Sequence, residues 1–393
     1  MQSHEAFFLL KGSMGIPKLQ FLLRTAPCCL SDEVLLLDEV LRGLLEAITN
    51  THLLPDSWTQ ASLPVRWGGV GIRRPSVLAP SAFLASFHSS YPLMGSYLPS
   101  TLIDSSDVLY ARMKDVWTNL SGPTCPVGAA ASSQRAWDDG TSLALSSSLL
   151  EQASPVARAR LLAATAPSSG AWLHAFPLTS LGLRLGKDEL RVAVGLRVGA
   201  PLVRPHTCRC GVDVDSLGLH GLSCRRSAGR HRRHGWANDV ILRAVRSLNI
   251  HAELEPPRLV RGDGKRPDGA TVDPWSRGRY LVWDFTCPDT VAPSHLPQST
   301  RVAGSAATEA ETRKVTKYRD IVASGDYIFV PVAVETLGAW GPAADSFCQE
   351  LGSRISRESG DLRSTAFLRQ RISLAVQRGN AASVLGTKPQ EED

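Results

Sequence analysis

Two aspartates in the second half of the chain have the types and setting needed to bind a divalent cation. Asp268 follows Arg266-Pro267 in a turn, and Asp284 interrupts the apolar, strand-like run from Tyr280 to Thr286. An unpaired carboxylate in such a strand is costly unless a cation or hydrogen bonds compensate. Brought together on neighbouring strands, the two would offer the hard oxygen ligands that suit Mg²⁺. This arrangement predicts metal-assisted hydrolysis of a phosphodiester.

Two lysines on a later helix are candidates to complete this site. The helix is expected from about Ala303 to Ala323, and its alanines share one stripe with Lys314 and Lys317 at about 100° per residue. The small-residue face can pack closely on a sheet, so both lysines would point toward the same place. Such a lysine can orient or deprotonate water and stabilise charge on phosphorus. The sequence leaves open which lysine acts, and the adjacent Tyr318 is a further candidate.

Each of these residues also has an ordinary structural interpretation. Asp268 is a common turn residue, Lys317 could be solvated, and Lys314 could pair with Glu311 three residues earlier. We favour the metal site because these residues occur together, in order and with compatible secondary structure. No lysine stands two residues after Asp284, so that role passes to the helix. The other acidic residues that could enter the site are Asp289, Glu253 and Glu255.

Three cysteines and a histidine in a short segment form a candidate zinc site. Cys208 and Cys210 are separated by one residue, and after nine more come His220 and, in an H-x3-C pattern, Cys224. Four such ligands suit tetrahedral zinc, and the glycines between them let the chain fold tightly. The alternative is three buried thiols beside a surface histidine. Because C-x-C is less usual than C-x-x-C, the ligand set stays open to His206, His231 or His234.

Arginines are concentrated around this segment. Residues 201–240 hold seven arginines against three acids, which is +4 of the formal net charge of +6. A basic patch held on a rigid module favours a polyanionic partner, although it could also be a solvated surface. The arginines that we expect to bind nucleic acid are Arg225, Arg226, Arg230, Arg232 and Arg233.

The elements that must position these residues follow a change of character near Gly199. Residues before it are mostly helical, with a clear amphipathic helix capped by Ser31. The part after it begins with strands, turns and basic loops. Its core is expected as a helix from Trp236 to Leu248, two strands, the lysine helix and a strand from Tyr327 to Glu335. Two final helices are expected near 343–356 and 364–378.

The composition bounds the class of protein. With 393 residues, 43% hydrophobic, the chain can form two or three domains. We expect no membrane partner, because no apolar run approaches the roughly 18 residues of a membrane span and no signal peptide is evident. Cysteines clustered beside a histidine indicate a metal site in a reducing compartment more than a disulfide framework. The protein is therefore expected to be soluble and intracellular.

The motifs from residue 208 to residue 318 together resemble the C-terminal region of non-LTR retrotransposon reverse transcriptase polyproteins. That region joins a CCHC zinc knuckle to a restriction-like endonuclease of the PD-(D/E)xK superfamily. Gly15-Ile-Pro-Lys18 and the stretch from Ser62 to Ile72 resemble the thumb and linker of the same polyprotein. No Tyr/Phe-x-Asp-Asp polymerase signature occurs in the chain.

The resemblance implies an α+β fold, in which an N-terminal helical thumb/linker region precedes a small zinc knuckle and an α/β restriction-like nuclease core. The implied regions are an N-terminally truncated thumb (1–120), a helical linker (121–200), the knuckle with its basic patch (201–235), the nuclease core (236–340) and C-terminal helices with a tail (341–393). Asp268 and Asp284 would bind Mg²⁺, a lysine would complete that site, and the ligands of Zn²⁺ would be Cys208, Cys210, His220 and Cys224.

The implied function is nicking of target DNA for integration by target-primed reverse transcription in the nucleus. The implied partners are target DNA, element RNA and the reverse transcriptase portion of the polyprotein. A different function is also consistent with the sequence, namely a non-catalytic, zinc-dependent nucleic-acid-binding fragment of a decayed retroelement. A purely helical interaction domain left from a polymerase thumb would explain only residues 1–199.

Overall fold

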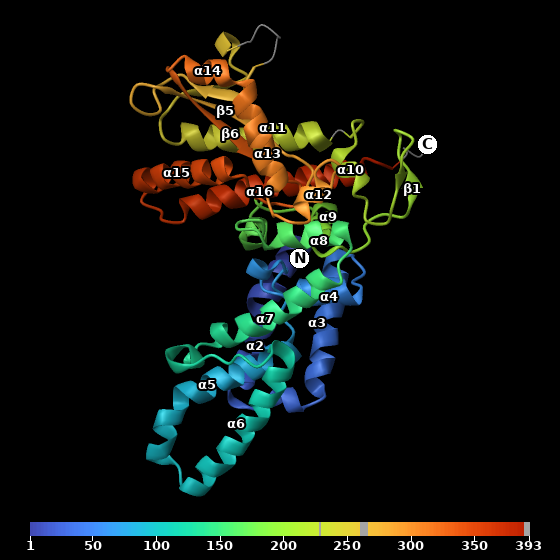
Figure 1. The fold of residues 1–393 in the computed structure, drawn as a ribbon, viewed down its shortest axis with the longest axis vertical. Coiled ribbons are helices and arrows are strands. Elements are labelled where there is room, and N and C mark those ends of the chain that lie inside the picture. Colours follow the sequence, from blue (N-terminus) through green and yellow to red (C-terminus); the bar gives the residue numbers. More distant parts are fainter. Residues whose placement is uncertain (228, 260–265, 389–393) are drawn as a thin grey trace. The chain divides into compact units, whose positions relative to one another are not determined.

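The computed structural model describes residues 1–227, 229–259 and 266–388 (Figure 1). The chain divides into two compact units, Met1–Ala153 and Ser154–Asp393. The fold is a mixture of helices and small sheets, as expected for the α+β class. Within the described ranges, no helix is both long and apolar enough to cross a membrane.

The first unit is helical. Its interior includes Trp117 and Trp137, both fully buried, whose rings meet edge to face with 4.8 Å between centroids. The helix expected after Ser31 begins at Glu33, and Asp32 occupies its N-cap position. The α-helices of this unit are α1 (Ser3–Leu9), α2 (Ile16–Thr25), α3 (Glu33–Thr49), α4 (Pro55–Ser62), α5 (Pro75–Tyr97), α6 (Ser100–Ser121) and α7 (Gln134–Glu151).

The second unit begins before the boundary that we expected near residue 200. It includes α9 (Lys187–Val198), which packs against α16 (Ser364–Leu385) near the end of the chain. The finer division into linker, knuckle, core and C-terminal helices stays a prediction. The other α-helices of this unit are α8 (Pro155–Thr165), α10 (His220–Ser223), α11 (Gly229–Arg246), α12 (Leu296–Ser299), α13 (Ser305–Lys317), α14 (Arg319–Ala323) and α15 (Pro342–Ser359).

The described residues of this unit form a two-stranded and a four-stranded sheet. The strands are β1 (His206–Thr207), β2 (Asp213–Val214), β3 (Ala252–Leu254), β4 (Gly269–Thr271), β5 (Tyr280–Thr286) and β6 (Tyr327–Ala333). The larger sheet has the order β3-β4-β5-β6, and β5 pairs antiparallel with β4 and parallel with β6. Gly269 stands opposite Trp283, where any Cβ atom would overlap the indole ring. Glycine is therefore required directly after Asp268.

Helices cover both faces of the larger sheet. Because side chains alternate along a strand, Leu281, Trp283 and Phe285 of β5 face one way and join α11, α15 and α16 in a core. Val282 faces the other way and packs with Ile321 of α14. The sheet thus forms the middle layer of the second unit.

The helix that carries the lysines packs on the sheet through its alanines, as expected. Ala307 and Ala310 of α13 pack against Ala333 of β6. The single helix expected over 303–323 is two helices, because the backbone of Tyr318 (φ −108°, ψ 22°) departs from helical values between α13 and α14. The lysines consequently lie in the last turn of α13.

The core differs from the expected order of elements in two places. α11 begins at Gly229 rather than near Trp236, so the arginine- and histidine-rich stretch is helical and not a basic loop. β3 is a strand that we did not predict, and it precedes the two expected ones. The order is therefore α11, the three strands β3, β4 and β5, the helices α12, α13 and α14, and the strand β6.

Candidate active site and metal centre

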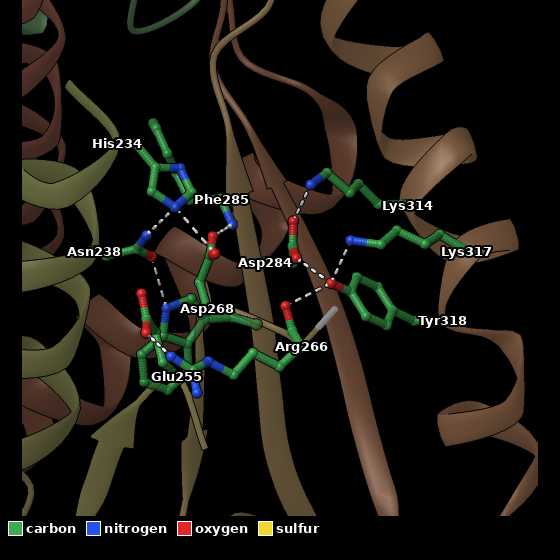
Figure 2. Close-up of polar contacts among 11 residues, drawn as sticks. His234, Asn238, Glu255, Arg266, Asp268, Asp284, Phe285, Lys314, Lys317 and Tyr318 are labelled. Carbon is green, nitrogen blue, oxygen red and sulfur yellow. Dashed lines mark hydrogen bonds and ion pairs between the residues drawn. The ribbon is translucent and has the colours of Figure 1, made fainter. Parts of the chain in front are cut away.

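Asp284 lies near the end of β5, on the side of the sheet covered by α13 and α14 (Figure 2). Its side chain is 2% exposed, and its two oxygens have different partners. Lys314 of α13 forms an ion pair with Oδ2, and the Tyr318 hydroxyl donates to Oδ1 over 2.7 Å. A buried carboxylate is stable when it is paired in this way.

Asp268 lies beside Asp284 at the same end of the sheet (Figure 2). It precedes Gly269, which pairs with Trp283, so the strand register brings the two aspartates next to each other. The main-chain N–H of Phe285 donates to Asp268 Oδ2 over 2.6 Å. The Asp268 side chain thereby continues the hydrogen-bonded ladder by one step, and two carboxylates distant in sequence meet.

His234 also belongs to this site, although in the sequence we considered it only as a zinc ligand. Its Nε2 lies 3.0 Å from Asp268 Oδ1. The hydrogen bond with Asp268 is the main cause that raises the pKa of His234 above its ordinary value, against the opposing effect of burial. The second contact of the Asp268 carboxylate therefore comes from α11.

Asn238 connects His234 to the sheet. Its Nδ2 lies 3.2 Å from His234 Nε2, and its Oδ1 accepts a hydrogen bond from Trp283 Nε1 over 3.0 Å. The two residues are four apart on α11 and so share a face. This spacing is visible in the sequence, but it is informative only once the helix is known to begin at Gly229.

The two lysines contact the site differently. Lys314 contacts Asp284 directly, whereas Lys317 donates to the Tyr318 hydroxyl over 2.6 Å. Glu311, the alternative partner of Lys314, instead accepts main-chain N–H groups at the start of α15. Lys314 is therefore the lysine nearer to the carboxylate pair.

Replacing Tyr318 with phenylalanine should weaken the site. The hydroxyl lies at hydrogen-bond distance from Asp284 Oδ1, Lys317 Nζ and the Arg266 carbonyl oxygen. Its loss deprives a buried carboxylate of a donor, which costs about 1–3 kcal/mol. We expect Tyr318→Phe to lower the free energy of unfolding of the second unit by this amount in urea denaturation. An equal loss in Tyr280→Phe, which removes a hydroxyl elsewhere, would contradict a specific role.

The other acidic candidates have partners of their own. Glu253 and Glu255 each form an ion pair with a nearby arginine. Asp289 is 8% exposed and accepts a hydrogen bond from a threonine hydroxyl over 3.0 Å, and burial raises its pKa. Lys265, part of the turn motif, lies outside the described residues. Asp268 and Asp284 remain the carboxylates that the structure brings together.

The four candidate zinc ligands form a cluster. Their ligand atoms all lie within 4.8 Å of one another. The sulfurs of Cys208 and Cys224 are 3.8 Å apart, and Cys210 Sγ lies 3.1 Å from His220 Nε2. A tetrahedral ion with Zn–S bonds of about 2.3 Å separates two sulfurs by about 3.8 Å. The cluster could therefore hold a metal such as zinc.

The turn between β1 and β2 explains how the closely spaced Cys208 and Cys210 reach one cluster. The Cys208 N–H donates to the Val212 carbonyl over 2.8 Å, which closes the turn. Gly211 within it has a φ of +88°, a left-handed conformation that favours glycine. A tight turn can thus aim both sulfurs at the same point.

The alternative histidine ligands lie elsewhere. The ring nitrogens of His206 contact the Arg204 carbonyl over 2.8 Å and the Thr387 hydroxyl over 3.1 Å. His231 is an exposed residue of α11, and His234 contacts Asp268. The structure therefore favours His220 as the imidazole of the cluster.

The basic patch is exposed except for one arginine. Arg233 departs from our expectation because it is 2% exposed. Its guanidinium donates to Asn380 Oδ1 over 2.5 Å and to the Leu222 carbonyl over 3.3 Å, and so ties α11 to α16 and α10. The exposed members are Arg225, Arg226, Arg230 and Arg232.

The second unit thus carries two chemically different groups of side chains. One is a carboxylate pair in contact with an ammonium and an imidazole. The other is a sulfur-rich cluster of the kind that binds zinc. The chain matches no protein-family model and no curated protein sequence.

Proposed function

We propose that the second unit hydrolyses a phosphodiester of DNA, one strand at a time, and exposes a 3′-hydroxyl. The observation that carries this proposal is the meeting of Asp268 and Asp284 beside the Lys314 ammonium. Paired carboxylates next to a cationic side chain suit the charge that develops at phosphorus during hydrolysis. The resemblance to restriction-like endonucleases supports the same reaction.

The donor set is compatible with Mg²⁺. Asp268 and Asp284 would hold the cation, because Mg²⁺ in proteins is bound through one or two carboxylates, with water and substrate phosphate filling the other positions. When bound, it would polarise the phosphate and make water more acidic. His234 and Lys314, which contact the two carboxylates, would keep them in place.

These positions support a hydrolytic reaction. The oxygen of a water molecule bonds to phosphorus as the P–O3′ bond breaks, which leaves a 5′-phosphate and a 3′-hydroxyl. Lys314 would orient this water and stabilise the added negative charge. Lys317 would act through the Tyr318 hydroxyl, which it contacts, and so help to position Asp284.

The Cys/His cluster would hold in place the arginines that bind the nucleic acid. With Zn²⁺ bound, it would form a rigid support for the exposed arginines that follow Cys224. Guanidinium groups held in this way bind phosphates and release condensed counterions. The arginines that we assign to this role are Arg225, Arg226, Arg230 and Arg232.

The wider setting rests on the resemblance of the sequence. It places the nick in target-primed reverse transcription in the nucleus, where a reverse transcriptase extends the 3′-hydroxyl along element RNA. That polymerase would be supplied by another part of the polyprotein, because this sequence has no polymerase signature. The alternative is a zinc-dependent nucleic-acid-binding fragment without catalysis.

A plasmid assay with lysine variants tests the proposal. We expect the wild-type chain with Mg²⁺ to convert supercoiled plasmid into nicked circles. Lys314→Met should lower the rate by about 100-fold or more, as loss of a positioned acid–base group does, and Lys317→Met should have a smaller effect. A larger loss in Lys317→Met would reverse the two roles. Tight DNA binding by zinc-loaded protein, without cleavage in the presence of any added divalent metal, would favour the alternative.

A further inference from the structure

A second basic feature of the second unit lies apart from the carboxylate pair and the Cys/His cluster. It is a cleft of about 360 Å³ between α11, α16 and the loop 179–182. α11 lines it with Trp236, Val240 and Arg243, at positions i, i+4 and i+7. Such residues share one face of a helix. α16 lines it with Arg371, Ala375 and Arg378, at the same spacing.

The cleft is positively charged. Three arginines and one carboxylate, Asp239, line it. Asp239 accepts from Arg243 Nε over 3.0 Å, and Arg378 donates to the carbonyls of Gly182 and Arg184. Arg378 therefore supports the loop, and Arg243 has a carboxylate partner.

Arg371 is the cation without such a partner. Within the described ranges it forms no hydrogen bond or ion pair, and its guanidinium carbon lies 5.8 Å from the centroid of the Phe367 ring. Burial and then repulsion from Arg243 lower the pKa of Arg371, against the opposing attraction of the Asp239 carboxylate. With no hydrogen-bonded carboxylate, the Arg371 guanidinium keeps its donors for a bidentate contact with a phosphate that enters the cleft.

Trp236 supplies an aromatic surface at the same cleft. It is 38% exposed. The buried face of α11 is formed by smaller residues such as Ala237 and Ile241. An exposed indole beside arginines can stack on the base of a nucleotide whose phosphate the arginines bind.

We propose that this cleft binds single-stranded nucleic acid, with an unpaired base stacked on Trp236 and the adjacent phosphate held by Arg371. A single strand is required because stacking on the indole needs a base whose face is free. Thr179 and Ser180, which also line the cleft, offer hydroxyl groups. The proposal extends the nuclease function, since it gives the protein a second contact for a strand freed near the nick.

Binding of a fluorescent single-stranded oligonucleotide, measured by anisotropy with the full chain and no added Mg²⁺, tests this. We expect Trp236→Ala to weaken binding by about 5- to 150-fold, the effect of losing one base–aromatic stack of about 1–3 kcal/mol. Trp236→Phe should restore most of the affinity. Arg371→Gln should weaken binding and reduce the slope of log K against log salt by about 0.7, the loss of one phosphate contact.

Arg357→Gln is the matched control, because it removes an equal charge from an exposed position on α15. It should leave the affinity nearly unchanged. Unchanged binding in Trp236→Ala, an unchanged salt slope in Arg371→Gln, or stronger binding of an acidic peptide than of the oligonucleotide would overturn the proposal. Nicking is measured separately. Trp236-dependent binding by a chain that does not nick DNA would therefore contradict the proposed nuclease function and still support the proposed binding at the cleft.

Discussion

Replacing Asp284 with asparagine is expected to lower plasmid nicking by at least about 100-fold while the chain stays folded. Asparagine keeps an oxygen that can accept from the Tyr318 hydroxyl, but it removes the negative charge that pairs with Lys314. A divalent cation would lose one of its two carboxylate ligands at the same time. The measurement is the initial rate at which supercoiled plasmid is nicked with Mg²⁺.

Asp361→Asn is the control for this change. Asp361 has a side chain that is 48% exposed and pairs with Arg363, so the same isosteric change there should leave nicking at the wild-type rate. Asp268→Asn should repeat the loss seen for Asp284, because the proposal needs both carboxylates. Full activity in a folded Asp284→Asn protein, judged by thermal unfolding, would exclude this residue from the chemistry.

The carboxylate site was largely predictable because its geometry follows from local patterns. A turn before one strand and a carboxylate within the next one predict that Asp268 and Asp284 meet, and the register between Gly269 and Trp283 brings them together. The alanine stripe of α13 predicts a helix that packs closely on the sheet, and its last turn carries Lys314 to Asp284. These contacts depend on strand alternation and helical periodicity, which a sequence displays.

The contacts that α11 makes with the site were not predictable, because they depend on long-range packing and not on a local pattern. Its first two turns are rich in arginine and histidine and lack apolar periodicity, so no local pattern indicates a helix that begins at Gly229. Long-range packing supports this start, since Gly229 and Arg233 pack against Ser383 and Gly379 of α16. The burial of Arg233 likewise depends on Asn380, which is 147 residues away.

The early start of the second unit and the extra strand have similar causes. α9 belongs to this unit through its packing on α16, and local composition does not predict this contact. β3 has three residues, which is too short for a reliable period-two pattern. It pairs antiparallel with β4. Non-local contacts therefore decided the features that sequence reasoning missed.

Removing one ligand of the Cys/His cluster is expected to abolish metal binding and unfold the surrounding segment. We expect the wild-type chain to contain one zinc per molecule and Cys224→Ser to contain almost none. Cys208 and Cys224 share a hydrophobic core with Leu222 and with Val384 of α16, so loss of the cluster also loosens that packing. Structural zinc binds with roughly 10–16 kcal/mol in small modules, as much as the net stability of a domain. A fall in Tm should therefore accompany the loss of zinc.

The readouts for this prediction are elemental analysis of zinc and hydrogen exchange over residues 206–224. Cys125→Ser, which changes a free cysteine of the first unit, should retain zinc and wild-type protection. Wild-type protein without zinc, or a full complement of zinc in Cys224→Ser, would contradict a metal site here. Because Arg233 ties α11 to the segment through the Leu222 carbonyl, unfolding the cluster should also displace His234 and reduce nicking. Asp284→Asn, by contrast, should lose nicking and keep its zinc, so the two variants separate the Cys/His cluster from the carboxylate pair.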